Sequence, residues 1–146
     1  MRPEVKIKKL LPNAILPTYG SETAAGADLY AVLDETLEIQ PHTTVKIHTG
    51  LSMEIPVGYA GFIYARSSMG TKQGLAPANK VGVIDSDYRG EVMVCLHNHS
   101  ESVQCVEPNQ RIAQIVIAPY LHVMFTEADE LSDTTRGTGG FGSTGK

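Results

Sequence analysis

The sequence predicts a single all-β domain, built either as a sandwich or as a barrel. No long segment shows sustained helical periodicity, and short β-rich runs alternate with turn signals instead. The 14 glycines and 8 prolines are spread along all 146 residues rather than gathered in one linker. Short strands at this spacing are typical of sandwiches and barrels, and a chain of this length can bury a substantial core.

The expected strands are rich in valine, isoleucine, leucine and tyrosine, and turn-forming residues separate them. In chain order they cover residues 5–10, 28–32, 36–39, 44–48, 51–55, 59–64, 81–84, 91–96, 102–106, 111–118 and 122–125. Only residues 67–73 could form a short helix. The pattern ends near Leu131, so we expect a folded domain over residues 1–130 and a flexible tail over residues 131–146.

The charge balance and the cysteines limit the classes of function. A net charge of −4 argues against a protein that binds a nucleic-acid backbone. A nucleotide ligand remains open, because a few local cations or a metal ion can neutralise one triphosphate. With no export signal and no apolar run long enough to cross a bilayer, we expect a cytoplasmic protein. Its Cys95 and Cys105 should then be reduced, although a cross-strand disulfide between them is geometrically possible.

The last eleven residues, from Arg136 to Lys146, carry five glycines, one phenylalanine and two cations. Glycine loses more backbone freedom on ordering than any other residue, so a ligand would have to supply the contacts that fix this segment. Its amides, hydroxyls and arginine suit phosphate oxygens, and Phe141 suits a flat ring. The composition indicates a lid over a nucleotide, and a plain disordered tail is the competing interpretation. A P-loop is excluded, because no helix follows the partial match at residues 140–146.

Four further segments combine polar and charged residues with the strand pattern: Ala25–Tyr30, Arg66–Gly70, Asn79–Gly90 and Asn109–Ile115. Followed by the glycine-rich tail, they resemble in order the five motifs of the homotrimeric dUTP pyrophosphatase (dUTPase) family. The resemblance runs from about Val5 to Lys146, and five motifs in order are far more specific than any one of them. One departure is Ala65, where many members have a proline that stiffens the strand end.

The resemblance implies a jelly-roll-like, distorted β-barrel that assembles as a homotrimer with active sites between subunits. It also implies hydrolysis of dUTP to dUMP and pyrophosphate with Mg²⁺. That reaction keeps uracil out of DNA and supplies dUMP for thymidylate synthesis. The sixteen residues from Leu131 to Lys146 can span at most about 50 Å, enough to cover a neighbour's site.

Three residues would serve the reacting water and the metal under this resemblance. Asp85 would act as general base on the water that attacks the α-phosphorus. Gln114 would help to hold that water and the metal-bound waters, and Asp28 would contact Mg²⁺ mainly through water. Interpreted locally, Asp85 is a turn aspartate and Asp28 a polar residue at a strand end. Gln114 lies among apolar neighbours, and a buried glutamine needs partners.

The phosphates would be bound from two segments. Arg66, Ser67 and Ser68 would stabilise the leaving pyrophosphate, although a helix cap beside a surface charge is the simpler local interpretation. Arg136 would act at the terminal phosphate. Further tail contacts would come from Phe141, stacked on uracil, and from Gly142, Ser143 and Thr144, wrapped around the triphosphate.

The base and the sugar would lie against the third segment. Asn79 and the backbone of Gly82, Val83 and Ile84 would match the acceptor–donor–acceptor edge of uracil, whereas cytosine would leave a buried group unpaired. Tyr88 would lie flat against the sugar and exclude a 2′-hydroxyl. The local interpretations are a β-bulge at Gly82 and a half-buried core aromatic at Tyr88.

Two other functions compete with this one. A dCTP deaminase shares the fold by family relationship, but it needs an acid–base group beside the pyrimidine ring. A non-catalytic regulator could use a nucleotide-gated tail to bind a partner protein, but binding alone needs no general base such as Asp85. His97 and His99 fall on one strand face without a further ligand nearby in sequence, so we interpret them as part of a polar turn.

Overall fold

The computed structural model describes residues 3–142 and is nearly all β, which confirms the predicted class. The described part contains eleven strands and one short π-helix, η1. The strands are β1 (Lys6–Lys9), β2 (Thr18–Tyr19), β3 (Ala27–Tyr30), β4 (Leu37–Ile39), β5 (Thr44–Glu54), β6 (Tyr59–Tyr64), β7 (Leu75–Pro77), β8 (Gly82–Ile84), β9 (Glu91–Asn98), β10 (Gln104–Val106) and β11 (Arg111–Pro119), and η1 spans Met69–Gln73. No helix within residues 3–142 is long and apolar enough to span a membrane.

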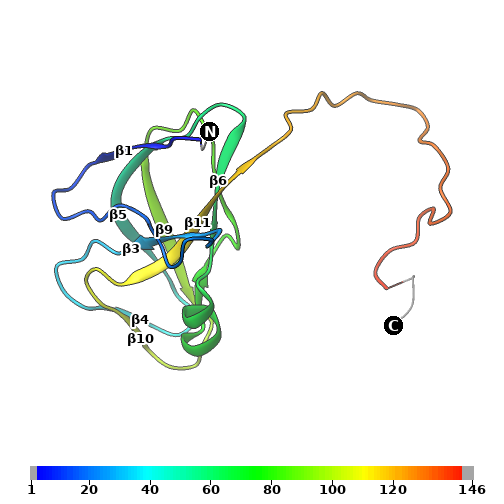
Figure 1. Ribbon diagram of the computed structural model, residues 1–146. Coiled ribbons are helices and arrows are strands. Elements are labelled where there is room, and N and C mark those ends of the chain that lie inside the picture. The colour runs from blue at the N-terminus through cyan, green and yellow to red at the C-terminus, as the bar shows by residue number, and fades with distance from the viewer. Residues whose placement is uncertain (1–2, 143–146) are drawn as a thin grey trace.

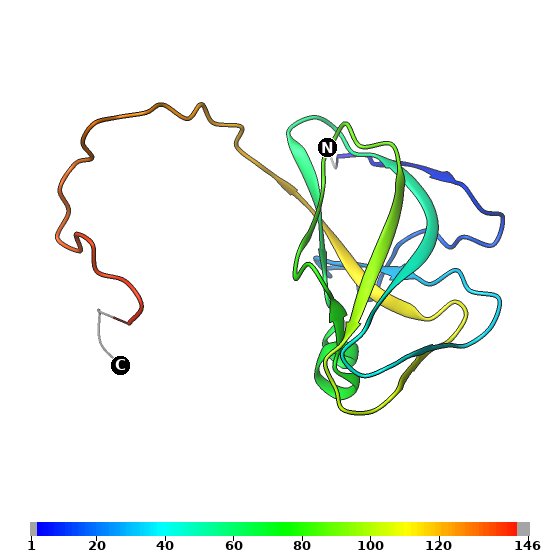
Figure 2. The same ribbon diagram turned by 180° about the vertical axis from the view of Figure 1, so that it is seen from behind.

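The strands form two larger sheets and one small one, all antiparallel (Figures 1 and 2). The first sheet has the order β1-β5-β9-β7, the second has the order β2-β3-β11-β6-β8, and β10 pairs with β4. Both larger sheets contribute to one core, with Ile47 and Leu96 from the first and Leu29 and Ile112 from the second. Two sheets around a shared core form a jelly-roll-like fold, and hydrogen bonds between the described strands do not close it into a complete barrel.

Strand β9 shows how the sequence pattern sets the two faces of a sheet. Every second side chain from Val92 to Asn98 is buried, because successive side chains of a strand point to opposite faces. The intervening side chains form a half-exposed outer face that includes Cys95. Cys105 lies on β10, which pairs with β4 and not with β9. Both thiols are free, so the cross-strand disulfide that the sequence allowed between Cys95 and Cys105 does not form.

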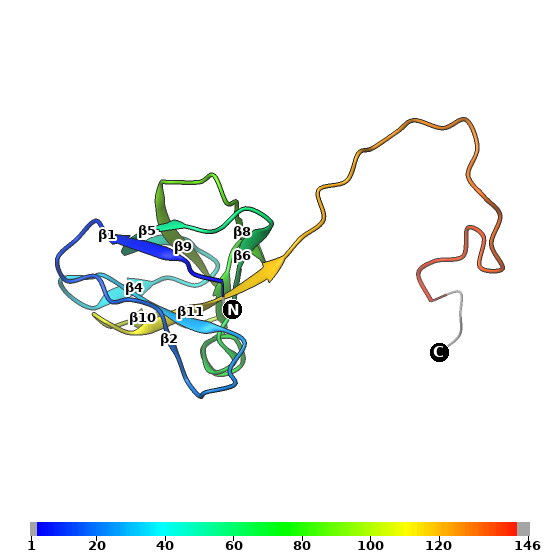
Figure 3. The same ribbon diagram turned by 45° about the horizontal axis from the view of Figure 1, so that its top comes forward.

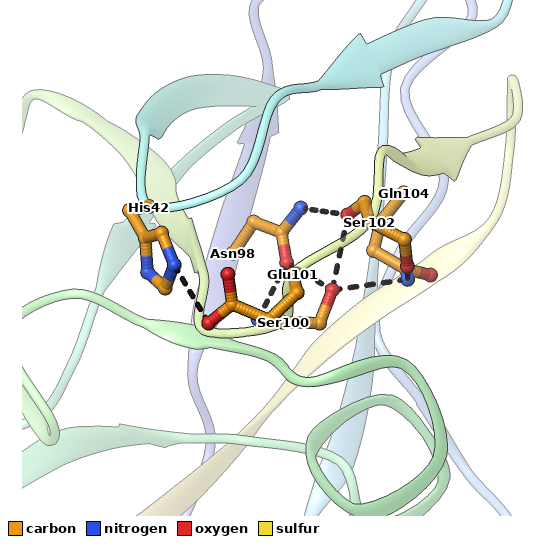
Figure 4. A network of polar contacts seen from close by, with 6 residues as sticks. All are labelled: His42, Asn98, Ser100, Glu101, Ser102 and Gln104. Atoms are coloured by element: carbon orange, nitrogen blue, oxygen red, sulfur yellow. Dashed lines mark hydrogen bonds and ion pairs between the residues drawn. The ribbon is translucent and has the colours of Figure 1, made fainter.

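The end of β9 carries a fully buried polar side chain, Asn98, whose amide is satisfied on both sides (Figure 4). Its Nδ2 donates to the carbonyl oxygens of Ile39 at 2.9 Å and Ser102 at 2.8 Å. Its Oδ1 accepts from the amide of Ser100 at 2.9 Å and from the hydroxyl of that serine at 2.7 Å. A buried amide is tolerated only when its groups are paired, so this network fixes β9 to β4 and to the turn that follows.

Strand β5 corrects one expectation. The sequence indicated separate strands at residues 44–48 and 51–55, whereas β5 is continuous and its pairing with β9 shifts between His48 and Ser52. Gly50 within this shift has a φ of +66°, a conformation that favours glycine. The turn signal in the sequence therefore marks a β-bulge inside one strand.

A second expectation is wrong, because residues 122–125 do not form a strand. After β11 the chain has no further helix or strand up to Gly142, and it leads away from the sheets in all three views (Figures 1 to 3). Met124 is 90% exposed and Phe125 is 94% exposed. The apolar pattern is present, but no described strand of the same chain pairs with it.

Candidate active site

A carboxylate held between two arginines lies on the second sheet. Asp28 on β3 has a side chain that is only 12% exposed. Arg66, two residues beyond β6, donates from Nε to Asp28 Oδ1 at 2.8 Å, and Arg111 donates from Nη1 to Oδ2 at 3.3 Å. Because β11 lies between β3 and β6, the fold brings together residues that are 38 and 83 positions apart. Two cations and one anion leave a net positive charge, which suits a phosphate group.

Gln114 lies beside this arginine cluster of Asp28, Arg66 and Arg111. On β11 it pairs with Asp28 of β3 on one side and with Tyr64 of β6 on the other. Its Nε2 donates to the carbonyl oxygen of Ala65 at 3.0 Å, so the glutamine has the partner that its apolar surroundings required. Its Oε1 lies over Gly26, where a Cβ would collide with it. Gly26 therefore leaves room for the side chain that carries this polar group.

The helix expected at residues 67–73 is present and begins directly after Arg66. Ser67 and Ser68 are helical and exposed, and they lead into η1. The hydroxyl of Ser68 makes no capping hydrogen bond, so the interpretation of this segment as a helix cap is not supported. The two exposed serines instead follow Arg66 of the arginine cluster directly in the chain.

A small pocket of about 100 Å³ lies between β8 and β9. It is lined by Ile63, Pro77, Asn79, Gly82, Val83, Ile84, Met93, Val94 and Cys95. Gly82 is buried, and a Cβ at this position would lie 3.3 Å from Nδ2 of Asn79. The absence of a side chain at Gly82 thus lets the Asn79 amide lie close to the strand. The structure brings together all four residues that the sequence assigned to the base.

A second pocket, of about 230 Å³, shares a wall with the first. It is lined by Lys46, Asp85, Tyr88 and Glu91 together with the shared residues Val83, Ile84, Met93 and Cys95. The hydroxyl of Tyr88 donates to the carbonyl oxygen of Glu91 at 2.9 Å, and its ring covers Gly90, where a Cβ would collide with it. This contact fixes a half-exposed aromatic ring next to the exposed carboxylate of Asp85.

No residue of the arginine cluster lines either of these two pockets within one chain. Figure 3 shows β8 beside β6, and Ile84 of β8 pairs with Gly61 near the start of β6. By this register Asp85 lies level with Ala60, the second residue of β6, whereas Arg66 lies two residues beyond the end of β6. Six residues at about 3.3 Å each separate the backbones of Asp85 and Arg66 by roughly 20 Å along β6. The residues that the sequence assigned to one site thus form two separate groups in a single chain.

The tail lies away from both groups. Arg136 is turned toward its own segment, where its Nε donates to the carbonyl oxygen of Gly139 at 2.8 Å. Phe141 is fully exposed. Gly142 is the last described residue of the tail, and Ser143 and Thr144 lie outside the described residues. Within residues 3–142, the tail of a chain contributes nothing to the pockets of the same chain.

Sequence reasoning missed several residues that the structure places at these groups. Arg111 had a signal, because it lies three residues before Gln114 in the same polar segment. Lys46 and Glu91 had no such signal in the sequence, because their place in the second pocket depends on the pairing of β5 with β9. A larger hollow of about 430 Å³, lined by Pro3, Val5, Tyr19, Glu22, Ala24 and Ile117, contains none of the expected site residues.

Within the described part of the chain, few side chains are placed to bind a metal ion directly. Within residues 3–142, no group of three or more histidines, cysteines, aspartates or glutamates could hold a metal ion. His97 and His99, with ring centroids 4.5 Å apart, remain a pair at the end of β9. Each oxygen of Asp28 accepts one arginine hydrogen bond and keeps further lone pairs for water. This donor set fits a Mg²⁺ ion that arrives on substrate phosphates with its own waters.

Comparisons with known proteins match almost the whole chain. The dUTPase family model matches residues 12–145. The deoxyuridine 5'-triphosphate nucleotidohydrolase of Picosynechococcus sp. is 48% identical over 141 residues, which cover 97% of this chain and 98% of that protein. The protein of that name from Desulfitobacterium hafniense is 51% identical over 131 residues, 89% of this chain and 87% of that protein. The solved dUTPase of Staphylococcus bacteriophage 80alpha with dUPNHPP has a TM-score of 0.90 at 27% identity and covers 98% of this chain and 99% of its own.

The fold and the two residue groups define an all-β protein with small polar pockets and a cationic cluster that suits phosphate. The matches in sequence and in structure then give the family. The chain belongs to the dUTPase family.

Proposed function

We propose that this protein hydrolyses dUTP to dUMP and pyrophosphate. The observation that carries the proposal is the pair of adjoining pockets, which hold Asn79 and Gly82 next to Asp85 and Tyr88 in a chain of the dUTPase family. The curated relatives named deoxyuridine 5'-triphosphate nucleotidohydrolase support the substrate, and the phage structure with dUPNHPP supports a nucleotide ligand.

The smaller pocket would select the base. The amide of Asn79 and the exposed backbone groups of β8 can match the acceptor–donor–acceptor edge of uracil, whereas the amino group of cytosine would leave a polar group unpaired at a cost of about 1–3 kcal/mol. The close approach of Asn79 to Gly82 leaves little room for the methyl group of thymine. Tyr88, held by Glu91, would lie against the deoxyribose and reject a 2′-hydroxyl.

The larger pocket would hold the reacting water. Asp85 would accept a proton from this water while the water oxygen forms a bond to the α-phosphorus. The bond from the α-phosphorus to the bridging oxygen of the β-phosphate would break, and the pyrophosphate would leave with the electron pair. Gln114, from the other group, would orient the water through its amide.

The cluster around Asp28 would receive the leaving pyrophosphate. Asp28 fixes the guanidinium of Arg66 in place, so the cation is oriented before negative charge develops. Arg111, Ser67 and Ser68 would add donors on the same side. Mg²⁺, when it is bound with the substrate, would neutralise phosphate charge, and Asp28 would contact its waters.

We infer that the two groups meet between subunits of a homotrimer. Within one chain, the separation of roughly 20 Å along β6 keeps Arg66 away from a phosphate that Asp85 could serve. A second copy would bring its arginine cluster to the first copy's pockets, and residues 131–146 of a neighbour would close over them as a lid. The exposed apolar side chains of Leu121, Met124 and Phe125 support this assembly, because such a run is normally covered.

A nucleotide panel tests the proposed function. With Mg²⁺ present, dUTP should yield dUMP and pyrophosphate, while dCTP, dTTP and UTP should react at least about 100-fold more slowly, since each leaves a polar group unpaired or meets a steric clash. Products would be separated by ion-exchange chromatography. Deamination of dCTP would favour the related deaminase, and tight binding of dUTP without turnover would favour a regulator. Within the cell, the reaction would keep uracil out of DNA and supply dUMP for thymidylate synthesis.

A further inference from the structure

We propose that Lys46 is a further substrate-binding residue, which contacts the α-phosphate of the nucleotide; this inference rests on the proposed function. Lys46 lies on β5 and pairs with Cys95 on β9. Its side chain lines the same 230 Å³ pocket as Asp85 and Tyr88. The carboxylate, the aromatic ring and the ammonium group therefore come from three different segments to one pocket.

The direction of the Lys46 side chain follows from the strand period. Ile47, the next residue of β5, is fully buried in the core, so Lys46 points to the outer face of the sheet. Met93 and Cys95 line the pocket from the same face. The aliphatic stem of the lysine can lie along these side chains while its ammonium group remains in water at the pocket.

The charges around this pocket leave Lys46 available to a ligand. Three lining residues are charged: Lys46, Asp85 and Glu91. Glu91 is already engaged, since its Oε2 lies 2.9 Å from Nδ1 of His48 and its Oε1 accepts from the amide of Gly50 at 2.8 Å. Across residues 3–142, neither Lys46 nor Asp85 takes part in an ion pair. The pocket thus presents one cation and one anion to whatever binds there.

The proposed reaction determines which phosphate lies next to this cation. The attacking water must lie within hydrogen-bond reach of Asp85 and directly behind the α-phosphorus, so the α-phosphate lies at this pocket. Among residues 3–142, Lys46 is the only cation that lines it. The β- and γ-phosphates would point toward the arginine cluster of another copy. Lys46 would therefore bind the phosphate that stays on dUMP, whereas the arginines would bind the pyrophosphate that leaves.

This division of roles gives a distinctive binding pattern. A contact made equally to substrate, transition state and product lowers KM and strengthens product binding without changing kcat. Lys46→Met should weaken dUMP binding and raise the KM for dUTP, each by about tenfold, as expected for one partly exposed charged hydrogen bond. Deoxyuridine, which has no phosphate, should bind with unchanged affinity. Lys46→Arg should remain close to wild type, because it keeps the charge.

The test is calorimetric titration of each variant with deoxyuridine and with dUMP, combined with steady-state hydrolysis of dUTP. Lys8→Met, which removes an exposed lysine on β1 outside this pocket, serves as the matched control and should change none of these values. Unchanged dUMP affinity in Lys46→Met would overturn the proposal, and so would an equal loss of deoxyuridine affinity, which indicates a distorted pocket. Failure of the proposed function would appear separately, as a wild-type protein that releases no pyrophosphate from dUTP.

Discussion

Asp85→Asn is expected to lower kcat for dUTP by about 1,000-fold, within the range that general-base catalysis contributes. An asparagine amide has nearly the same size as the carboxylate, but it cannot accept the proton of the attacking water. Because Asp85 is exposed at the edge of its pocket, the change should leave the fold and the affinity for dUMP largely intact. Pyrophosphate release and calorimetric titration with dUMP would measure the two effects.

A matched control separates the role of Asp85 from a general loss of negative charge. Asp34 is exposed and lines neither of the two pockets, so Asp34→Asn should turn over dUTP at the wild-type rate. Wild-type turnover by Asp85→Asn would refute the assignment of this residue as the base. A parallel loss in both variants would also count against it, because the effect would then not depend on position.

Removal of residues 136–146 is expected to lower kcat/KM for dUTP by at least about 100-fold, because even one preorganised donor to developing charge is worth this much. The deletion takes away Arg136, the aromatic ring of Phe141 and the glycine amides that would exclude water. Steady-state hydrolysis of dUTP by the truncated chain would measure the loss.

The same truncation should leave the folded domain intact. Phe141 is fully exposed, and the side chain of Arg136 bonds only within its own segment, so neither stabilises the sheets of its own chain. The thermal unfolding temperature should therefore match that of the full chain. Full activity in the truncated protein would show that the tail is no lid. A large fall in the unfolding temperature would show that the tail is part of the fold.

Much of the fold could be predicted from the sequence, because runs rich in β-branched and aromatic residues alternate with turn-forming residues. Residues 59–64 were predicted with their observed bounds. Strand β9 was predicted with the correct start, but the predicted strand ended two residues before the observed end at Asn98. The short strands β2 and β7 were missed, because two or three residues carry too little periodicity to be recognised. Gly50 was misread as a turn, since a bulge and a turn both favour a glycine with positive φ.

The candidate site was predictable only where its residues are close in sequence. Asn79, Gly82, Asp85 and Tyr88 share one segment, and the structure gathers them at two adjoining pockets. Lys46 reaches the same place only through the pairing of β5 with β9, which a sequence without known register does not reveal. The distance between the pockets and the arginine cluster likewise depends on the register of β6 with β8.

The most direct test of the central claim mixes two inactive variants. Asp85→Asn keeps the arginine cluster, and Arg66→Gln keeps the base, so a site built from two copies can be whole only in a mixed oligomer. When equal amounts are unfolded and refolded together, random assembly should restore about a quarter of the wild-type rate of dUTP hydrolysis, since half of the bases and half of the arginines are intact. A rate no higher than that of the separate variants would contradict a shared site.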